Sequence, residues 1–178
     1  MVGDKMSNFI ANQRRFAVLG DNIFQITNKL AKNKRLCQLL VNTGRNPFDP
    51  KLAPVNGDDL IGRNILIVPK IPDDPEQPQN LKEELSYIVV MLSQFQLNPL
   101  NKEFKDIWIR FDIVCPQTQW ALDEPSARPY LMMQEIDMMF NEQRISGIGR
   151  MQFLTAYPLV LSGYISGYTM QYGFDQFN

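Results

Sequence analysis

Carboxylates are the side chains of this sequence with the most scope for chemistry, because it contains no histidine. The commonest general base, the commonest metal ligand and every Ser-His or Cys-His nucleophile are therefore excluded. Adjacent acidic pairs occur at Asp58-Asp59, Asp73-Asp74 and Glu83-Glu84. Neighbouring side chains on an extended chain point apart, so each pair is a poor acid–base couple and is typical of solvated loop charge.

A carboxylate-based hydrolase, such as a glycosidase, needs two carboxylates about 5–10 Å apart across a cleft. Asp106 and Asp112 share one face of a predicted strand, but their spacing in the sequence places them about 20 Å apart. The sequence contains no phosphate-binding loop and no calcium loop. Gly147-Ile148-Gly149 lies between a helix and a strand, which is the reverse of the order in a dinucleotide fingerprint. We therefore expect no catalytic residues, no metal and no cofactor, and a hydrolase is the less favoured alternative.

The composition indicates a single folded domain. The chain has 178 residues, of which 44% are hydrophobic, and its net charge is −1. This charge balance gives no reason to expect a sequence-specific nucleic-acid binder. Cys37 and Cys115 lie far apart in the sequence and are expected to be buried thiols rather than a disulfide. The sequence shows no secretory signal and no membrane-spanning run, so we expect synthesis in a cytoplasm and no membrane partner.

Helical patterns occupy two regions. Asp21 is the predicted N-cap of a helix over Asn22–Ala31. Asn33 is the predicted N-cap of a second helix, over Lys34–Val41, and Gly44 is expected to end that helix. A third helix is predicted over Ser126–Asn141, with Ser126 as N-cap. Its predicted buried stripe consists of Met132, Met133, Ile136, Met139 and Phe140, while Glu135 is expected on the other side.

Strands are predicted at five places: Arg63–Val68, Leu85–Phe95, Lys105–Cys115, Met151–Thr155 and Val160–Phe174, with Pro158 interrupting the last two. The Lys105–Cys115 strand alternates strictly, and the Leu85–Phe95 strand is apolar on both faces and so is expected in the interior of its sheet. These elements predict an α+β fold with a single mixed, mainly antiparallel sheet packed by two or three helices. Residues 1–20 form an N-terminal arm or short helix, and residues 21–178 form one domain with protruding proline-rich loops at 43–62 and 69–84 and arms at the termini.

Candidate interface residues follow from exposure and charge. Trp120 lies in a loop just after a strand, where an exposed indole would anchor a partner, although covering the edge of the core is an equal alternative. We predict an acidic patch at Asp73, Asp74 and Glu76 and a basic patch among Arg14, Arg15, Lys34 and Arg35.

The block from Lys105 to Leu154 carries a family resemblance. Its alternating strand ends in FDIVC, a loop with a tryptophan follows, and RPYLMMQEIDMMFN precedes a GIG turn and an apolar strand. These features resemble small neck and tail-completion proteins of tailed bacteriophages, and most of all tail terminators. The resemblance extends over roughly residues 60–175.

The resemblance implies a structural virion protein at the neck of a phage tail, not an enzyme. Such a subunit forms a ring, usually of six copies, that caps the tail tube and joins it to the head. Its implied partners are further copies of itself, the tail tube protein, the sheath protein as a further candidate, and the neck or head-completion proteins. A head-completion or adaptor protein below the portal is the alternative within the same class.

Overall fold

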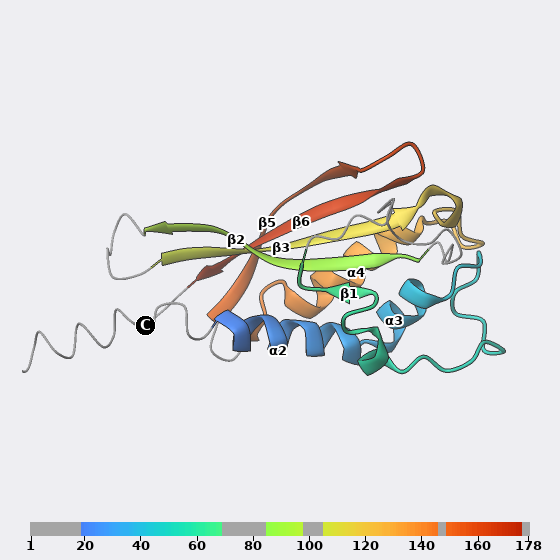
Figure 1. Ribbon diagram of the computed structural model, residues 1–178, viewed down its shortest axis with the longest axis horizontal. Coiled ribbons are helices and arrows are strands. Elements are labelled where there is room, and N and C mark those ends of the chain that lie inside the picture. Colours follow the sequence, from blue (N-terminus) through green and yellow to red (C-terminus); the bar gives the residue numbers. More distant parts are fainter. Residues whose placement is uncertain (1–18, 69–84, 98–104, 146–148, 176–178) are drawn as a thin grey trace, which may run out of the picture.

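A curled, mixed six-stranded sheet wraps around three α-helices in the computed structural model, which describes residues 19–68, 85–97, 105–145 and 149–175 (Figure 1). The strand order is β1-β2-β3-β6-β5-β4, in which only β1 and β2 run parallel. The strands are β1 (Ile65–Leu66), β2 (Tyr87–Leu97), β3 (Lys105–Pro116), β4 (Arg144–Ile145), β5 (Gly149–Val160) and β6 (Ile165–Asp175). The helices are α2 (Leu19–Lys32), α3 (Lys34–Val41) and α4 (Arg128–Phe140), with short 3-10 helices η1 (Gly57–Leu60) and η2 (Gln117–Gln119). The predicted fold class is confirmed.

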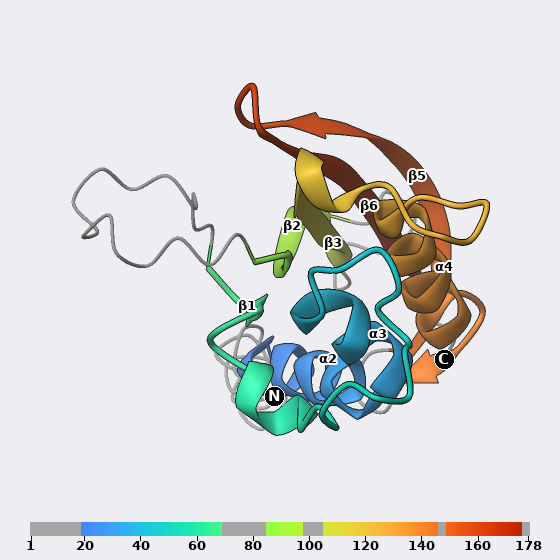
Figure 2. The same cartoon turned by 90° about the vertical axis from the view of Figure 1, so that its right-hand side faces the viewer.

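The core lies between the inner face of the sheet and the helices, as the curvature in Figure 2 shows. The alternation of β3 directs Ile109, Phe111, Ile113 and Cys115 toward the helices, and all four are fully buried. Phe140 of α4 packs on Phe111 with ring centroids 5.1 Å apart. Burial of these side chains supplies the main drive for the helices to dock on the sheet.

Asn33 links the short helix α3 to α4. Its side-chain oxygen accepts a hydrogen bond from the Leu36 amide at 3.0 Å, which confirms the predicted N-cap. The side-chain nitrogen of Asn33, Nδ2, donates a hydrogen bond to the Glu135 carboxylate at 2.9 Å. Arg35 Nε forms an ion pair with the same carboxylate at 3.0 Å. The expectation that Glu135 lies on the outer side of its helix is therefore wrong, because two polar partners from another helix offset its burial.

The predicted bounds of α3 are confirmed, but three predicted capping residues are wrong. Helix α2 begins at Leu19, which places Asp21 within the first turn instead of at the N-cap. Helix α3 ends with Asn42 as its C-cap, two residues before Gly44. Helix α4 begins after Ala127, which makes no side-chain capping bond, instead of after Ser126. Each N-terminal error spans only a few residues, because side-chain propensity fixes a helix end less tightly than tertiary contacts do.

Pro158 lies within β5 and does not interrupt it, contrary to the sequence-based expectation. Among the described residues, β4 pairs with β5 only at Gly149 and Arg150, so the outer edge of β5 around Pro158 has no partner strand. A proline is tolerated on an edge strand because no ladder bond depends on its missing N–H. At the other side of the sheet, β2 lies between β1 and β3 as expected, but β1 is two residues long and leaves Ile67 and Val68 exposed.

A buried arginine joins α4 to the segments around it. Arg128 is completely buried and donates hydrogen bonds to three backbone carbonyls, those of Gln119 at 2.9 Å, Leu39 at 2.6 Å and Gly44 at 2.6 Å. Burial lowers the pKa of its guanidinium from the ordinary value, yet an arginine remains charged in proteins. The charge lies against the C-terminal end of α3, where carbonyl groups are free to accept.

The polar network continues from Gln119. Its side-chain oxygen accepts from the Ser86 hydroxyl at 3.0 Å, and the Ser86 carbonyl accepts from Asn64 at 2.9 Å. Asn64, Ser86 and Gln119 are all buried. The network therefore connects the start of β2, the segment before β1, η2 and α4 through the interior.

The cysteines are both free and buried, as expected from the sequence. No helix in the described part of the chain has the length and apolar character required to span a membrane. Residues 1–18 and 69–84, which include most of the predicted arm and the second proline-rich loop, lie outside the described residues.

We expect Arg128→Met to lower the free energy of unfolding by about 3 kcal/mol or more, because three backbone carbonyls, two of them from buried residues, lose a charged donor. Arg128→Lys should also lower stability, since an ammonium group does not reproduce the planar set of N–H donors of the guanidinium. Urea unfolding followed by circular dichroism measures the effect. Arg150→Met is the control, because Arg150 pairs with Glu142 at the surface and should change stability little. Equal losses in the two variants would contradict the role given to Arg128.

Because two thiols are buried, we expect the free energy of unfolding to decrease at alkaline pH. Burial raises the pKa of Cys37 and of Cys115 to about 11, whereas the unfolded thiols ionise near the ordinary value of 9.0. The folded state therefore holds more protons between these values, and its stability should fall as the pH rises from about 9 to about 11. Urea unfolding at several pH values measures the slope, which should be shallower in Cys37→Ala/Cys115→Ala. Other titrating groups affect both chains alike, so identical slopes would contradict the assignment.

Candidate interaction surfaces

The tip of the β5–β6 hairpin presents apolar side chains to solvent. Val160 is 73% exposed, Tyr164 is 82% exposed and Leu161 is also exposed; we call these three residues the hairpin tip. The turn between the strands is held by Ser162, whose hydroxyl accepts from the amides of Tyr164 and Ile165, both at 3.2 Å. The hairpin tip is therefore an ordered apolar projection, and such a feature is typical of a surface that another molecule covers.

The outer edge of β5 continues this apolar surface. Phe153, Leu154 and Tyr157 are exposed large hydrophobic residues. The Phe153 amide donates to the Asn141 side chain at 3.1 Å, and beyond it no described strand pairs with this edge. An unpaired apolar edge offers backbone groups to a partner, although Pro158 removes one donor from it.

An aromatic cluster of Trp120, Tyr130 and Tyr168 lies on the helix-facing side of the same hairpin. The ring centroids of Tyr130 and Tyr168 are 5.4 Å apart, and their hydroxyl groups lie 3.1 Å apart. This hydrogen bond raises the pKa of Tyr168. Trp120 packs 6.3 Å from Tyr168 and is half-buried, and its buried indole Nε1 has no acceptor among the described residues. Trp120 thus covers the edge of the core, while Tyr130 carries the exposed part of the cluster.

Arg128 positions the segment that carries Trp120. The Arg128 amide donates to the Trp120 carbonyl at 3.0 Å, and its side chain holds the Gln119 carbonyl. Ala121 and Ala127 form an isolated bridge that closes the loop between them. The aromatic cluster is therefore fixed by the same residue that joins α4 to α3.

An apolar groove of about 540 Å³ runs between α2 and β1. Its exposed apolar members are Phe24, Ile61, Ile67 and Val68, and Phe24 is 62% exposed. In Figures 1 and 2 the hairpin tip and α2 lie on opposite sides of the molecule. The chain therefore carries two separate apolar surfaces that face different ways.

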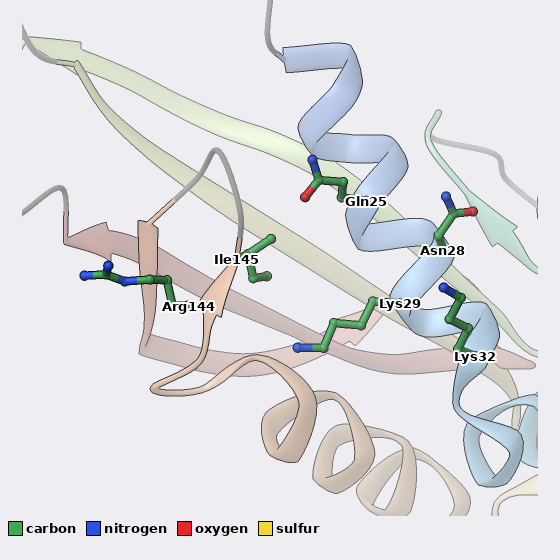
Figure 3. Close-up of a pocket in the computed structure, with 6 residues that line it drawn as sticks. All are labelled: Gln25, Asn28, Lys29, Lys32, Arg144 and Ile145. Carbon is green, nitrogen blue, oxygen red and sulfur yellow. The ribbon is translucent and has the colours of Figure 1, made fainter.

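A basic pocket of about 370 Å³ lies between α2 and β4. Its lining residues are Gln25, Asn28, Lys29, Lys32, Arg144 and Ile145, none of which is acidic (Figure 3). Lys29, Lys32 and Arg144 form no ion pair with any described carboxylate, although Lys29 lies 5.3 Å from the centre of the Phe140 ring. The walls of the pocket therefore carry basic side chains that have no acidic partner in the described part of the chain, and such a lining favours an anionic ligand.

The carboxylate candidates for hydrolysis do not form a site among the described residues. Asp112 is buried and is bound by Arg110 Nε at 2.7 Å and by the Thr169 hydroxyl at 2.6 Å. The hydrogen bond between Arg110 and Asp112 raises the pKa of Arg110. The described residues also contain no group of three acidic, histidine or cysteine side chains suited to a metal. Asp112 therefore links β3 to β6 within the sheet.

The predicted charged interface residues have different outcomes. Lys34 is exposed. Arg35 bonds Glu135, lies 4.0 Å from Glu124 and stacks 3.9 Å from the Phe48 ring centre, so its guanidinium is engaged within the molecule. The remaining predicted residues lie outside the described part of the chain, namely Arg14, Arg15, Asp73, Asp74 and Glu76. Their roles stay predictions.

Sequence reasoning missed the hairpin tip, the apolar groove and the basic pocket. Val160, Leu161 and Tyr164 flank a Ser-Gly pair, which is a turn signal that could have revealed the hairpin. Lys29 and Lys32 lie three residues apart on one helix, and this spacing was a visible sign of a basic face. Arg144 could not be joined to them from sequence, because β4 meets α2 only in the folded chain.

Together the fold and its surfaces define an α+β protein with an ordered apolar hairpin at its periphery. A model of the YomW family matches residues 33–174, which is more than half of the chain, and the chain belongs to this family. YomW is a phage-derived protein name, so membership indicates a phage-associated protein. No curated protein and no solved structure matches the chain.

Proposed function

We propose that this protein is a structural component of a tailed-phage virion, a tail terminator whose copies form a ring at the head-proximal end of the tail tube. The single observation that carries the proposal is the ordered, exposed apolar hairpin tip. The phage-derived family name and the resemblance to tail-completion proteins agree with it. The activity is binding: the subunit ends polymerisation of the tube by covering its last ring.

The hairpin tip is suited to contact with another subunit. Its apolar side chains make no contribution to the core, and leaving them in water costs free energy that burial in an interface recovers. The turn is held by four short-range hydrogen bonds, those from Leu161, Ser162, Tyr164 and Ile165, so little order has to be gained on binding.

A ring requires a second and different surface on each subunit. The apolar groove meets this requirement, because it lies on the other side of the molecule and exposes Phe24, Ile67 and Val68. In the proposed ring, the hairpin tip of one copy occupies the groove of the next. Head-to-tail contacts of this kind close into a ring when the rotation between neighbours permits.

We expect Val160→Asp/Tyr164→Asp and Phe24→Asp each to abolish ring formation while leaving the fold intact, because each places charge in an apolar contact. Mixing the two variants should give a heterodimer, since one intact tip then meets one intact groove. Light scattering coupled to size-exclusion chromatography measures the assemblies, and circular dichroism checks the fold. Met138→Asp is the matched control, because Met138 is 66% exposed on α4 and belongs to neither surface.

Two results would contradict this arrangement. Rings that survive both substitutions would show that neither surface is used, and a mixture that stays monomeric would exclude the head-to-tail contact.

The tail position is tested by adding either tail tube protein or portal protein to the purified chain. A complex with the tube protein supports a terminator, whereas a complex with the portal alone would assign the chain to head completion instead.

A further inference from the structure

The basic pocket has the charge and shape of a docking site for an extended anionic peptide. Lys29 extends from α2 toward β4, Lys32 lies farther along α2 beside Asn28, and Arg144 comes from β4. In Figure 3 the guanidinium of Arg144 points away from α2, so the three charges are spread out and do not converge on one point. A spread of charge suits a ligand with several carboxylates along its length better than a single small ion.

The surroundings of the pocket support recognition of such a ligand. Gln25 and Asn28 provide amide groups that can hydrogen-bond carboxylates, and Ile145 provides apolar surface between the two basic elements. The basic side chains lack acidic partners among the described residues, so a ligand does not have to displace an existing ion pair. Arg35 is different, because its guanidinium already pairs with Glu135.

The same chain contains an acidic segment of the required kind. Residues 73–84 carry five carboxylates, Asp73, Asp74, Glu76, Glu83 and Glu84, against the single lysine Lys82. The net negative charge of this segment is opposite in sign to the charge of the basic pocket. Because a ring brings neighbouring copies into contact, a segment of one copy can reach the pocket of another.

We propose that the basic pocket of one subunit binds the acidic segment, residues 73–84, of a second copy of the chain. This inference rests on the proposed ring and names a polar contact in addition to the apolar one. The charge pairing sets the register and the rate of assembly more than its final affinity. It also makes assembly sensitive to salt, because pairs of exposed charges are largely screened beyond about 8 Å at physiological ionic strength.

A charge exchange between the two sites tests the proposal in the full chain. Lys32→Glu/Arg144→Glu should slow ring assembly about tenfold at low salt, because attraction becomes repulsion. Asp73→Lys/Asp74→Lys should do the same, and the chain that combines all four changes should recover most of the rate. Stopped-flow light scattering measures the rates. The control Arg45→Glu/Lys51→Glu carries the same change of net charge on exposed residues outside the pocket.

A peptide experiment tests the same contact without relying on ring formation. The probe is a fluorescent peptide of residues 69–84, added to full-length protein that carries Asp73→Asn/Asp74→Asn/Glu76→Gln so that its own segment does not compete. Fluorescence anisotropy should detect binding of this peptide. The binding affinity should fall at least tenfold for the Lys32→Glu/Arg144→Glu protein, and also for a peptide in which every Asp is replaced by Asn and every Glu by Gln.

The outcomes separate the two proposals. Rings that form normally in all charge variants, together with no peptide binding, would overturn the contact and leave the proposed function standing. Peptide binding without any ring would support the contact and contradict the terminator. Binding of duplex DNA that depends on Lys32 and Arg144, with no binding of the peptide, would also overturn the proposal, because the ligand would then be a nucleic acid.

Discussion

The architecture depends on one buried cation. Arg128 has no exposed surface, and its guanidinium is satisfied by carbonyls from the end of α3, the following loop and η2. A charge in the interior is tolerated only when hydrogen bonds replace its hydration. These bonds fix the first turn of α4 against α3 and also hold the loop that carries Trp120. Helix α4 in turn covers β3 and β6, from which the hairpin extends.

Apolar and polar interactions have different places in the fold. The interior is packed with aliphatic and aromatic side chains, and one chain of polar exceptions runs by hydrogen bonds from Asn64 through Ser86 to Gln119. Outside this core the molecule exposes apolar residues at the hairpin tip and the groove, and it carries basic side chains without acidic partners among the described residues at the basic pocket. A rigid centre that presents different surfaces in different directions is what a repeating assembly requires.

Local features were predictable from sequence, and features that depend on distant segments were not. The alternation in β3 and the Asn33 cap were correct, because each depends on residues next to one another in the chain. Pro158 was misjudged because a proline is excluded from a central strand but tolerated at an edge, and the edge position of β5 is set by the whole sheet. Glu135 was misjudged because its partners, Asn33 and Arg35, come from another helix.

The candidate surfaces follow the same distinction. The sequence left Trp120 open between an anchor for a partner and a cover for the edge of the core. In the fold it is half-buried in an aromatic cluster with Tyr130 and Tyr168, which come from α4 and β6. The hairpin tip, the groove and the basic pocket each unite residues that the sequence separates, so they emerge only when the chain is folded. The charged residues that sequence favoured include Arg35, which the fold uses internally.

The central claim is that copies of this chain form a ring at the end of a phage tail tube. Electron cryo-microscopy of the assembled phage particle, with this chain located along the tail axis, tests the claim most directly. The account predicts a closed ring at the head-proximal end of the tube, with the hairpin tip of each copy against the next copy. A particle that lacks the chain, or that contains it as separated single copies, would contradict the account.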